Sequence, residues 1–173
     1  MPASGTALPV RLDHAVLRGT RRVLGGTAAV PVARGLSLSG DHALGWIAFG
    51  TVGSLASRRP EPWRTAVVGV VAAHAAGAAL KRLVPRPRPT FPDVPALVAA
   101  PSAPSFPSAH SCSTTAAAVG FGPLIGRPVM ATATGLMLVS RLLLGVHYPS
   151  DVLSGAALGA TVAAVVRRRG GMA

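Results

Sequence analysis

Five long apolar runs dominate the chain, and short segments between them carry most of its charged residues. The runs extend over about residues 42–57, 63–80, 111–126, 129–146 and 152–166. They are rich in Ala, Val, Leu and Gly and lack the charged outer face that a soluble helical bundle requires. Each is slightly shorter than the ~20 residues that usually cross a bilayer. A soluble bundle therefore stays open as an alternative, but the pattern favours about five transmembrane helices packed through small residues.

The first 40 residues form a basic segment with a different pattern. Apolar residues fall loosely on one helical face, and four arginines lie elsewhere on the same helix. This predicts an amphipathic helix that lies in the membrane surface rather than crossing the bilayer. Gly25, Gly26 and Pro31 then break the helical pattern. We therefore expect two parts, a basic amphipathic N-terminal segment (1–40) and a membrane-embedded core (41–173).

The segment 84–109 contains eight of the sixteen prolines of the chain. Proline lacks a backbone N–H and disfavours helical geometry in the residue before it, so this density predicts a stiff, extended loop. Long loops inside compact chains are usually functional. This one begins and ends beside polar residues that could carry chemistry, which supports a functional role.

The composition indicates a single domain of an all-α, polytopic membrane helical bundle. Half of the 173 residues are hydrophobic, only 13% are charged, and the mean hydropathy is +0.49. A soluble domain carries about a quarter charged residues. The charge deficit therefore agrees with the membrane interpretation of the apolar runs.

The net charge of +12 could also indicate a nucleic-acid-binding protein, and the rest of the pattern argues against this class. Aromatic residues, which stack on bases, make up only 4% of the chain. The arginines lie at the ends of apolar runs, where they can reach lipid headgroups. We expect membrane lipids with anionic headgroups, and no nucleic acid, as partners.

Lys81 is the only lysine beside sixteen arginines, and Arg88-Pro89 follows it seven positions later. Lysine is a compact point charge, whereas the planar arginine fork can hold two phosphate oxygens at once. Together they could neutralise a phosphate at the end of the second apolar run. Arg82 and Arg86 lie beside them, so a basic cluster at the membrane edge explains this segment equally well.

Pro107-Ser108-Ala109-His110 leads directly into the third apolar run. A serine before such a run is an ordinary helix cap, and this is the strong alternative for Ser108. A helix N-terminus also attracts anions, so the Ser108 hydroxyl and the Ala109 amide could both reach a phosphate. His110, at the start of the helix, could donate a proton to a departing alcohol oxygen.

Ser140-Arg141 interrupts the fourth run, and an ionisable residue inside a membrane segment is a functional candidate by default. A structural ion pair with Asp151 is the alternative for Arg141. Asp151 itself falls near the start of the last helix, where it could simply complement the helix dipole. It could instead orient His147 and leave the other ring nitrogen free to attack phosphorus.

Three other residues need an interpretation because their side chains are chemically active. His74, in the middle of the second run, is better explained as a hydrogen-bond partner between helices than as a ligand. His42 and the preceding Asp41 suit a helix cap, or a contact with a lipid headgroup. Cys112 is the only cysteine, so it cannot form an internal disulfide, and we expect a small buried side chain.

Three groups of residues resemble, in order and spacing, the signature motifs of the type 2 phosphatidic acid phosphatase superfamily, which includes vanadium-dependent haloperoxidases. They are Lys81 with Arg88-Pro89, Pro107-Ser108-Ala109-His110, and Ser140-Arg141 with His147 and Asp151. The resemblance covers about residues 41–166. The superfamily usually has glycine where this chain has Ala109, and alanine is restricted at positive φ, so the backbone donor there could be placed differently. We expect a small effect.

The resemblance implies an acid phosphatase/vanadium haloperoxidase-like core and a role for each motif residue. His147 would be the nucleophile that forms a phosphohistidine, Asp151 would orient it, and His110 would be the general acid. The phosphate-binding residues would be Lys81, Arg88, Ser108, Ala109 and Arg141. No metal or other cofactor is implied, and the sequence has no carboxylate cluster of the kind that holds Mg²⁺.

Residues 33–37, 41–46 and 144–149 resemble short phosphatases of this superfamily that act on decaprenylphosphoryl-5-phosphoribose for arabinan and cell-wall synthesis. This resemblance implies an integral membrane phosphatase for a phosphomonoester on a polyprenyl-linked lipid. Undecaprenyl diphosphate, phosphatidate and phosphatidylglycerophosphate are alternative substrates. A vanadate-dependent haloperoxidase and a non-catalytic binder of anionic lipids are alternatives of another class.

The charged residues near the two chain ends indicate on which side of the cell membrane the candidate site lies. The arginines at 167–169 follow the last apolar run and indicate a cytoplasmic C-terminus. Five spans would then place the candidate site on the extracytoplasmic side, whereas the basic N-terminal segment argues for the opposite orientation unless it lies flat. The sequence favours the outward-facing site and leaves the oligomeric state undetermined.

Overall fold

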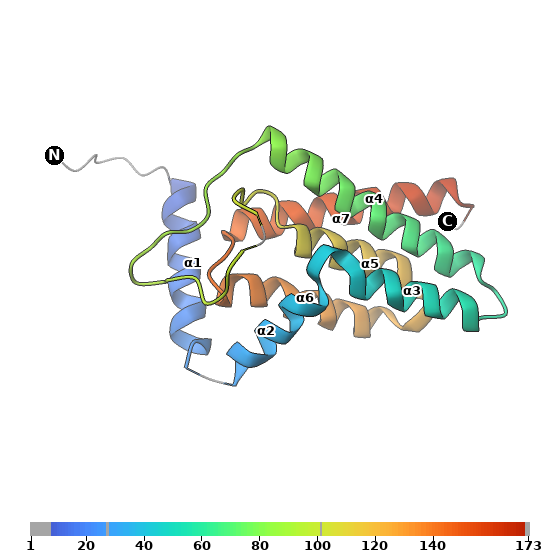
Figure 1. Ribbon diagram of the computed structural model, residues 1–173, viewed down its shortest axis with the longest axis horizontal. Helices are drawn as coiled ribbons and strands as arrows, with labels where there is room; N and C mark the ends of the chain where they lie inside the picture. Colours follow the sequence, from blue (N-terminus) through green and yellow to red (C-terminus); the bar gives the residue numbers. More distant parts are fainter. Residues whose placement is uncertain (1–7, 27, 101, 172–173) are drawn as a thin grey trace.

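The computed structural model describes residues 8–26, 28–100 and 102–171, and this part of the chain is all-α (Figure 1). The helices are α1 (Leu8–Leu24), α2 (Ala29–Ser39), the 3₁₀ turn η1 (Asp41–Ala43), α3 (Leu44–Ala56), α4 (Glu61–Leu83), α5 (Ala109–Ile125), α6 (Arg127–Leu143) and α7 (Pro149–Arg169). Each of the five apolar runs forms one helix, from α3 to α7. The predicted all-α class is confirmed.

Helices α3 to α7 form a bundle in which successive helices alternate in direction along the long axis of the molecule (Figure 1). One end holds the C-terminus of α4 and the N-termini of α5 and α7. Helix α1 crosses this end, and α2 packs beside α6. All three motif segments therefore meet at one end of the bundle, as the alternation of the apolar runs predicts.

The N-terminal segment contains two helices, where the sequence predicted one. Helix α1 is confirmed, and the chain turns after it at Gly25, whose amide donates to the Arg21 carbonyl at 2.8 Å. The predicted break at Pro31 is wrong, because Pro31 lies in the first turn of α2. Amides in a first turn have no acceptor within the helix, so a proline there removes no hydrogen bond.

Helices α5 and α7 are in close contact, and glycines on α7 make this possible. A Cβ atom at Gly159 would overlap the carbonyl oxygen of Cys112, and one at Gly155 would overlap that of Ser108. The spacing of four residues places both glycines on one face, which is the small-xxx-small pattern of packed membrane helices. Because α5 begins with the His110 motif and α7 with Asp151, this contact also sets the distance between the two motifs.

The proline-rich segment is non-helical, as predicted, at its described residues, 84–100 and 102–108, and these fold back over the end of the bundle. The Ser105 amide donates to the Arg86 carbonyl at 2.8 Å and closes this loop on itself. The Leu97 amide donates to the Leu144 carbonyl at 2.9 Å and attaches the loop to the end of α6.

The bundle buries several polar residues beside its apolar core, and it exposes many large apolar residues. Ser111, Ser113 and Thr114 are fully buried, whereas Val52 and Leu153 are each 65% exposed. Helices α4 and α7 are long and apolar enough to cross a membrane; α3, α5 and α6 fall short in length. The exposed apolar surface on α3, α4, α6 and α7 nevertheless requires an apolar environment or a partner that covers it.

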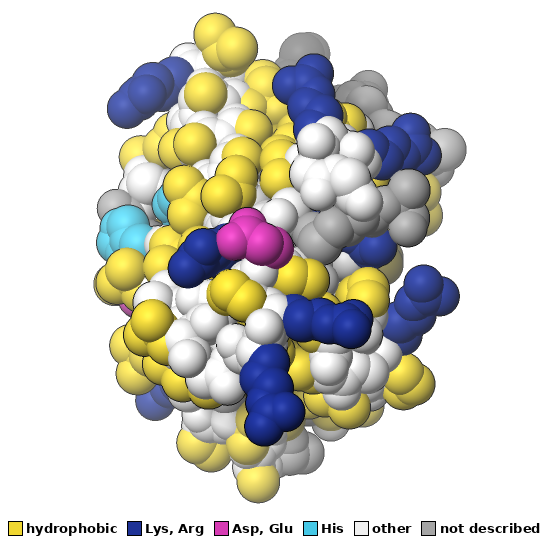
Figure 2. All heavy atoms as spheres, turned by 90° about the vertical axis from the view of Figure 1, so that its right-hand side faces the viewer, with side chains coloured by type: hydrophobic (Ala, Val, Ile, Leu, Met, Phe, Trp, Pro, Cys, Tyr) yellow, Lys and Arg dark blue, Asp and Glu magenta, His cyan; other side chains and the backbone are white. Residues whose placement is uncertain are grey.

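The end of the bundle opposite the motifs is basic (Figure 2). Arginine side chains surround this end and apolar side chains lie between them. The arginines that the sequence places here come from the α3–α4 connection, the starts of α4 and α6, and the last turn of α7: Arg58, Arg59, Arg64, Arg127, Arg167, Arg168 and Arg169. Their position agrees with the predicted separation of this charge from the candidate site.

Candidate active site

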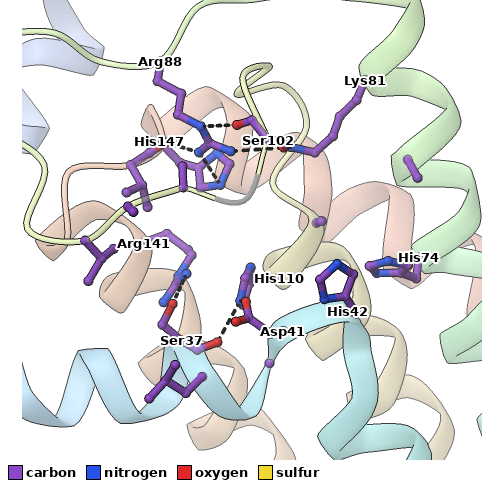
Figure 3. Close-up of a pocket in the computed structure, with 18 of the residues that line it drawn as sticks. Ser37, Asp41, His42, His74, Lys81, Arg88, Ser102, His110, Arg141 and His147 are labelled. Atoms are coloured by element: carbon purple, nitrogen blue, oxygen red, sulfur yellow. Dashed lines mark hydrogen bonds and ion pairs between the residues drawn. The ribbon is translucent and has the colours of Figure 1, made fainter.

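A cavity of about 650 Å³ opens at the end of the bundle where the three motifs meet (Figure 3). Helices α2, α4, α5 and α6, the turn η1 and the proline-rich loop all contribute to its wall. The predicted site residues that line it are Lys81, Arg88, Ala109, His110, Arg141 and His147. Stretches up to 66 residues apart in sequence thus form one basic pocket.

His147 lies in the short connection between α6 and α7 and is only 4% exposed. Its Nε2 atom is 3.3 Å from Nη1 of Arg88, and its Nδ1 atom is 3.7 Å from Oδ2 of Asp151. A guanidinium can only donate, so this contact requires a lone pair on Nε2 and places the ring proton on Nδ1, facing Asp151. This tautomer leaves Nε2 as the nucleophilic atom on the cavity side.

Asp151 is fully buried in the first turn of α7 and uses both oxygens. Oδ2 accepts the Tyr148 amide at 2.9 Å, and Oδ1 accepts Nη1 of Arg86 at 2.7 Å. The carboxylate therefore caps its helix and also lies beside His147. The helix-terminus interpretation and the His147-orienting interpretation of Asp151 are thus compatible. The 3.7 Å to the ring is beyond hydrogen-bond range, and among the described residues Nδ1 of His147 has no other partner.

Lys81 and Arg88 approach the cavity from α4 and from the proline-rich loop, and Ser102 lies between them (Figure 3). Nζ of Lys81 donates to the Pro104 carbonyl at 2.9 Å and contacts the Ser102 hydroxyl at 3.3 Å. Arg88 donates to the Ser102 carbonyl at 2.9 Å and to the Val146 carbonyl at 2.6 Å. Neutral carbonyls hold both cations in place without neutralising them, so their charge stays available for an anion.

Arg141 is 2% exposed and comes from the last turn of α6. It donates to the hydroxyls of Ser140 and Ser37, each at 3.1 Å. Neither partner carries charge. The alternative of an ion pair with Asp151 is wrong, because that carboxylate pairs with Arg86 instead.

His110 occupies the first turn of α5, on the side of the cavity formed by α2 and η1 (Figure 3). Its Nε2 atom lies 3.0 Å from the Ser37 carbonyl and 3.2 Å from Oδ1 of Asp41. Both groups accept hydrogen bonds, so Nε2 carries a proton. A Cβ at Gly40 would come within 2.7 Å of the His110 ring, and this glycine therefore permits the close approach of the α2–η1 corner.

Of the two predicted phosphate-binding residues at the start of α5, only Ala109 lines the cavity. The Ser108 hydroxyl accepts the Ser111 amide at 3.4 Å and the Ser111 hydroxyl at 3.0 Å, so Ser108 caps α5, as the simpler interpretation predicts. It is fully buried and does not line the cavity, whereas Ala109 does. Ala109 belongs to the regular helix and does not have a positive φ, so the geometry here requires no glycine.

The contacts that Asp13 of α1 makes near the site are not predicted from the sequence. Asp13 is only 5% exposed; it accepts Nη2 of Arg86 at 2.8 Å and both the amide and the hydroxyl of Ser150, at 3.0 and 2.7 Å. Arg86 thus bridges Asp13 and Asp151, and it also stacks on the Tyr148 ring at 3.9 Å. The one sequence signal that could have identified Arg86 is its position two residues before Arg88.

Burial lowers the pKa of His147 to about 4, with a raising effect of Asp151 and a lowering effect of Arg88. Burial also lowers the pKa of Arg88, although a guanidinium stays charged at neutral pH. The imidazole of His147 is therefore neutral at pH 7, as a nucleophile requires.

Among the described residues, no group of three or more His, Cys, Asp or Glu side chains is placed to hold a metal ion. The residues that line the cavity instead include Lys81, Arg88, Arg141, His110 and His147. Such a set can bind a phosphate, stabilise the charge that develops on it, and supply a nucleophile and an acid.

Comparison with known proteins agrees with this chemistry. The sequence profile of the PAP2 superfamily matches residues 62–172. A protein from Mycobacterium tuberculosis, named decaprenylphosphoryl-5-phosphoribose phosphatase, is 49% identical over 140 residues, which are 80% of this chain and 79% of that protein. A protein of the same name from Mycolicibacterium smegmatis is 43% identical over 147 residues, 84% of this chain and 82% of that protein.

Two solved structures share the fold. A transmembrane PAP2-type phosphatidylglycerolphosphate phosphatase from Bacillus subtilis has a TM-score of 0.76 at 23% identity, covering 95% of this chain and 87% of that one. LpxE from Aquifex aeolicus has a TM-score of 0.71 at 20% identity, covering 97% of this chain and 99% of that one. At this identity the likeness concerns the arrangement of the helices.

The first prediction concerns pH. The neutral form of His147 is the reactive one, and its pKa of about 4 lies below the usual histidine value near 6.5. Protonation of His147 should therefore remove activity only as pH drops toward about 4, and His110, which must carry a proton to act as the acid, sets a separate limb of the profile. The measurement is kcat/KM for phosphate release against pH, which reports groups of the free enzyme. An acid limb near pH 6.5 would contradict the assignment.

The second prediction concerns Asp13 as a positioning residue that acts through Arg86 and Asp151. Asp13→Asn keeps the shape but removes the charge, and we expect kcat to fall about tenfold with KM little changed, as for loss of one charged hydrogen bond. Asp93→Asn is the matched control, because Asp93 also holds α1, through His14 and Arg18, but lies away from the cavity. Equal losses in the two variants would mean that Asp13 only docks α1.

Proposed function

The chain belongs to the PAP2 superfamily, and on that premise we propose that it is a lipid phosphatase acting on decaprenylphosphoryl-5-phosphoribose. The reaction removes the 5-phosphate, a phosphomonoester, and leaves the polyprenyl-linked ribose. The single observation that carries the proposal is the convergence of His147, Arg88, Lys81, His110 and Arg141 on one cavity. The identity to the mycobacterial relatives supports the choice of substrate.

In the proposed mechanism, Nε2 of His147 attacks the phosphorus atom and forms a phosphohistidine. The bond between phosphorus and the C5 oxygen breaks, and His110 gives a proton to that oxygen so that the sugar leaves as an alcohol. A water molecule then attacks the phosphohistidine, His110 takes a proton from it, and inorganic phosphate is released. His147 returns to its neutral form.

The charges of the cavity support this mechanism. Lys81, Arg88 and Arg141 are fixed by carbonyls and hydroxyls, so they can stabilise the extra negative charge of the transition state without first moving. Asp151 stabilises the positive charge that develops on His147 when its Nε2 bonds to phosphorus. Ala109, at the N-terminus of α5, offers its backbone amide and the positive end of the helix dipole to the same anion. Ser108 acts indirectly, by capping that helix.

We further propose that α3 to α7 cross the cell membrane and that the cavity lies at the headgroup level of the extracytoplasmic side. The exposed apolar surface of the bundle supports the spans, and the short helices α3, α5 and α6 fit a bilayer that thins locally. The arginine-rich opposite end then faces the cytoplasm. Helix α1 lies across the cavity end, in the plane of the membrane surface, which also reconciles its positive charge with this orientation.

The third prediction tests substrate and chemistry together. Purified protein in EDTA should release phosphate from a prenyl-phosphoryl-ribose 5-phosphate faster than from phosphatidate, phosphatidylglycerophosphate or undecaprenyl diphosphate. EDTA should have no effect, because fixed cations replace a metal ion. Vanadate should inhibit, since it mimics the transferring phosphate, and peroxide with halide and vanadate should give little halide oxidation.

His147→Ala is the control for this assay, and it should fold normally yet lose turnover by a factor of roughly 10³ or more. Continued phosphate release by this variant would rule out His147 as the nucleophile. Preference for a different lipid phosphate would show that the protein is a phosphatase with another substrate. Halide oxidation as the main activity, or lipid binding without turnover, would contradict the proposed phosphatase function.

A further inference from the structure

We propose that His42 and His74 form a second part of the cavity, which binds the ribose and the bridging phosphodiester of the substrate while the catalytic residues hold the 5-phosphate. This inference rests on the proposed function and makes it more specific. It assigns a role to two polar side chains that the mechanism above does not use.

The two rings lie together on one wall of the cavity, away from His147 (Figure 3). Their centroids are 6.3 Å apart and tilted by 52°, and they come from different elements, η1 and α4. The helix–helix hydrogen bond expected for His74 is not formed at Nδ1, which is buried without a partner among the described residues. A buried polar atom without a partner is unfavourable unless a ligand or water satisfies it.

The backbone at His42 is strained in a way that places its ring in the cavity wall. His42 and Ala43 have φ values of 51° and 61°, in the left-handed region that residues with a Cβ rarely adopt. The sequence predicted a helix cap here, but neither η1 nor α3 has a side-chain cap. Strain of this kind is retained at binding and catalytic sites. The turn joins α2 to α3, and it also directs the His42 ring to the cavity wall.

The register of α4 connects this part of the cavity with the catalytic part. His74, Ala78 and Lys81 are spaced by four and three residues, so they share one helical face, and all three line the cavity. His74 precedes Lys81 by seven residues, which is about 10 Å along the helix. It therefore lies deeper in the bundle than Lys81, toward the bilayer interior in the proposed orientation.

The position of these histidines discriminates between classes of lipid phosphate. In a simple prenyl phosphate the apolar chain begins at the phosphate, and it would place CH₂ groups against two imidazoles. In a prenyl-phosphoryl-ribose 5-phosphate, hydroxyls and a second phosphate separate the reacting phosphate from the chain. Imidazoles offer both a donor and an acceptor, so they match these groups and could give Nδ1 of His74 a partner.

The experiment compares two substrates in the full-length protein: a prenyl-phosphoryl-ribose 5-phosphate and a prenyl monophosphate of the same chain length. His74→Ala and His42→Ala should each raise KM for the sugar-containing substrate about tenfold, the loss expected for one hydrogen bond to a charged group. They should change KM for the prenyl monophosphate less than twofold and leave kcat for it unchanged. Val71→Ala is the matched control, because Val71 is exposed on α4 and does not line the cavity.

The outcomes separate this inference from the proposed function. If the unmodified protein prefers the ribose-containing substrate and both variants keep its KM, the inference fails and the function stands. Equal losses on the two substrates would also overturn it, because they indicate a general effect on the site. If the unmodified protein prefers the prenyl monophosphate, the proposed substrate and this inference both fail. Retained KM for the monophosphate also shows that the variants fold.

Discussion

The geometry of the site depends on one buried carboxylate, that of Asp151. It is fully buried at the start of α7. Its two oxygens accept hydrogen bonds from Arg86 and from the Tyr148 amide, and one of them lies 3.7 Å from the His147 ring. A buried carboxylate without compensation is strongly unfavourable, so these partners must stay in place whenever the protein is folded. The loop that holds Arg86, the connection that holds His147 and helix α7 are thereby fixed to one another.

The apolar bundle makes this arrangement possible. Glycines on α7 bring it into contact with α5, so the helix that carries His110 begins close to the helix that carries Asp151. The proline-rich loop is stiff without being helical, and its carbonyls bind Lys81 and Arg88 where a helix would use them internally. Substrate phosphate therefore enters a site whose charges are already oriented, at the end of a bundle whose outer surface suits lipid.

Prediction from the sequence succeeded where the signal was local. Helices α3 to α7 follow from the apolar runs, the loop follows from prolines, and the capping role of Ser108 follows from its place before α5. It failed where the reason lies in tertiary contacts. Asp13 precedes its partner Arg86 by 73 residues, and nothing in its own surroundings distinguishes it from a surface carboxylate. The predicted break at Pro31 is wrong because the place of Pro31 in the first turn depends on where α2 begins.

The most direct test of the account is to identify the phosphorylated residue during turnover. Rapid quenching of the protein with a substrate that carries radiolabelled 5-phosphate should trap a phosphoprotein that is stable in alkali and labile in acid, as phosphohistidine is. Peptide mapping should place the label on His147, and the His147→Ala variant should stay unlabelled. Label on any other residue, or turnover with no labelled protein at any time, would contradict the proposed role of His147.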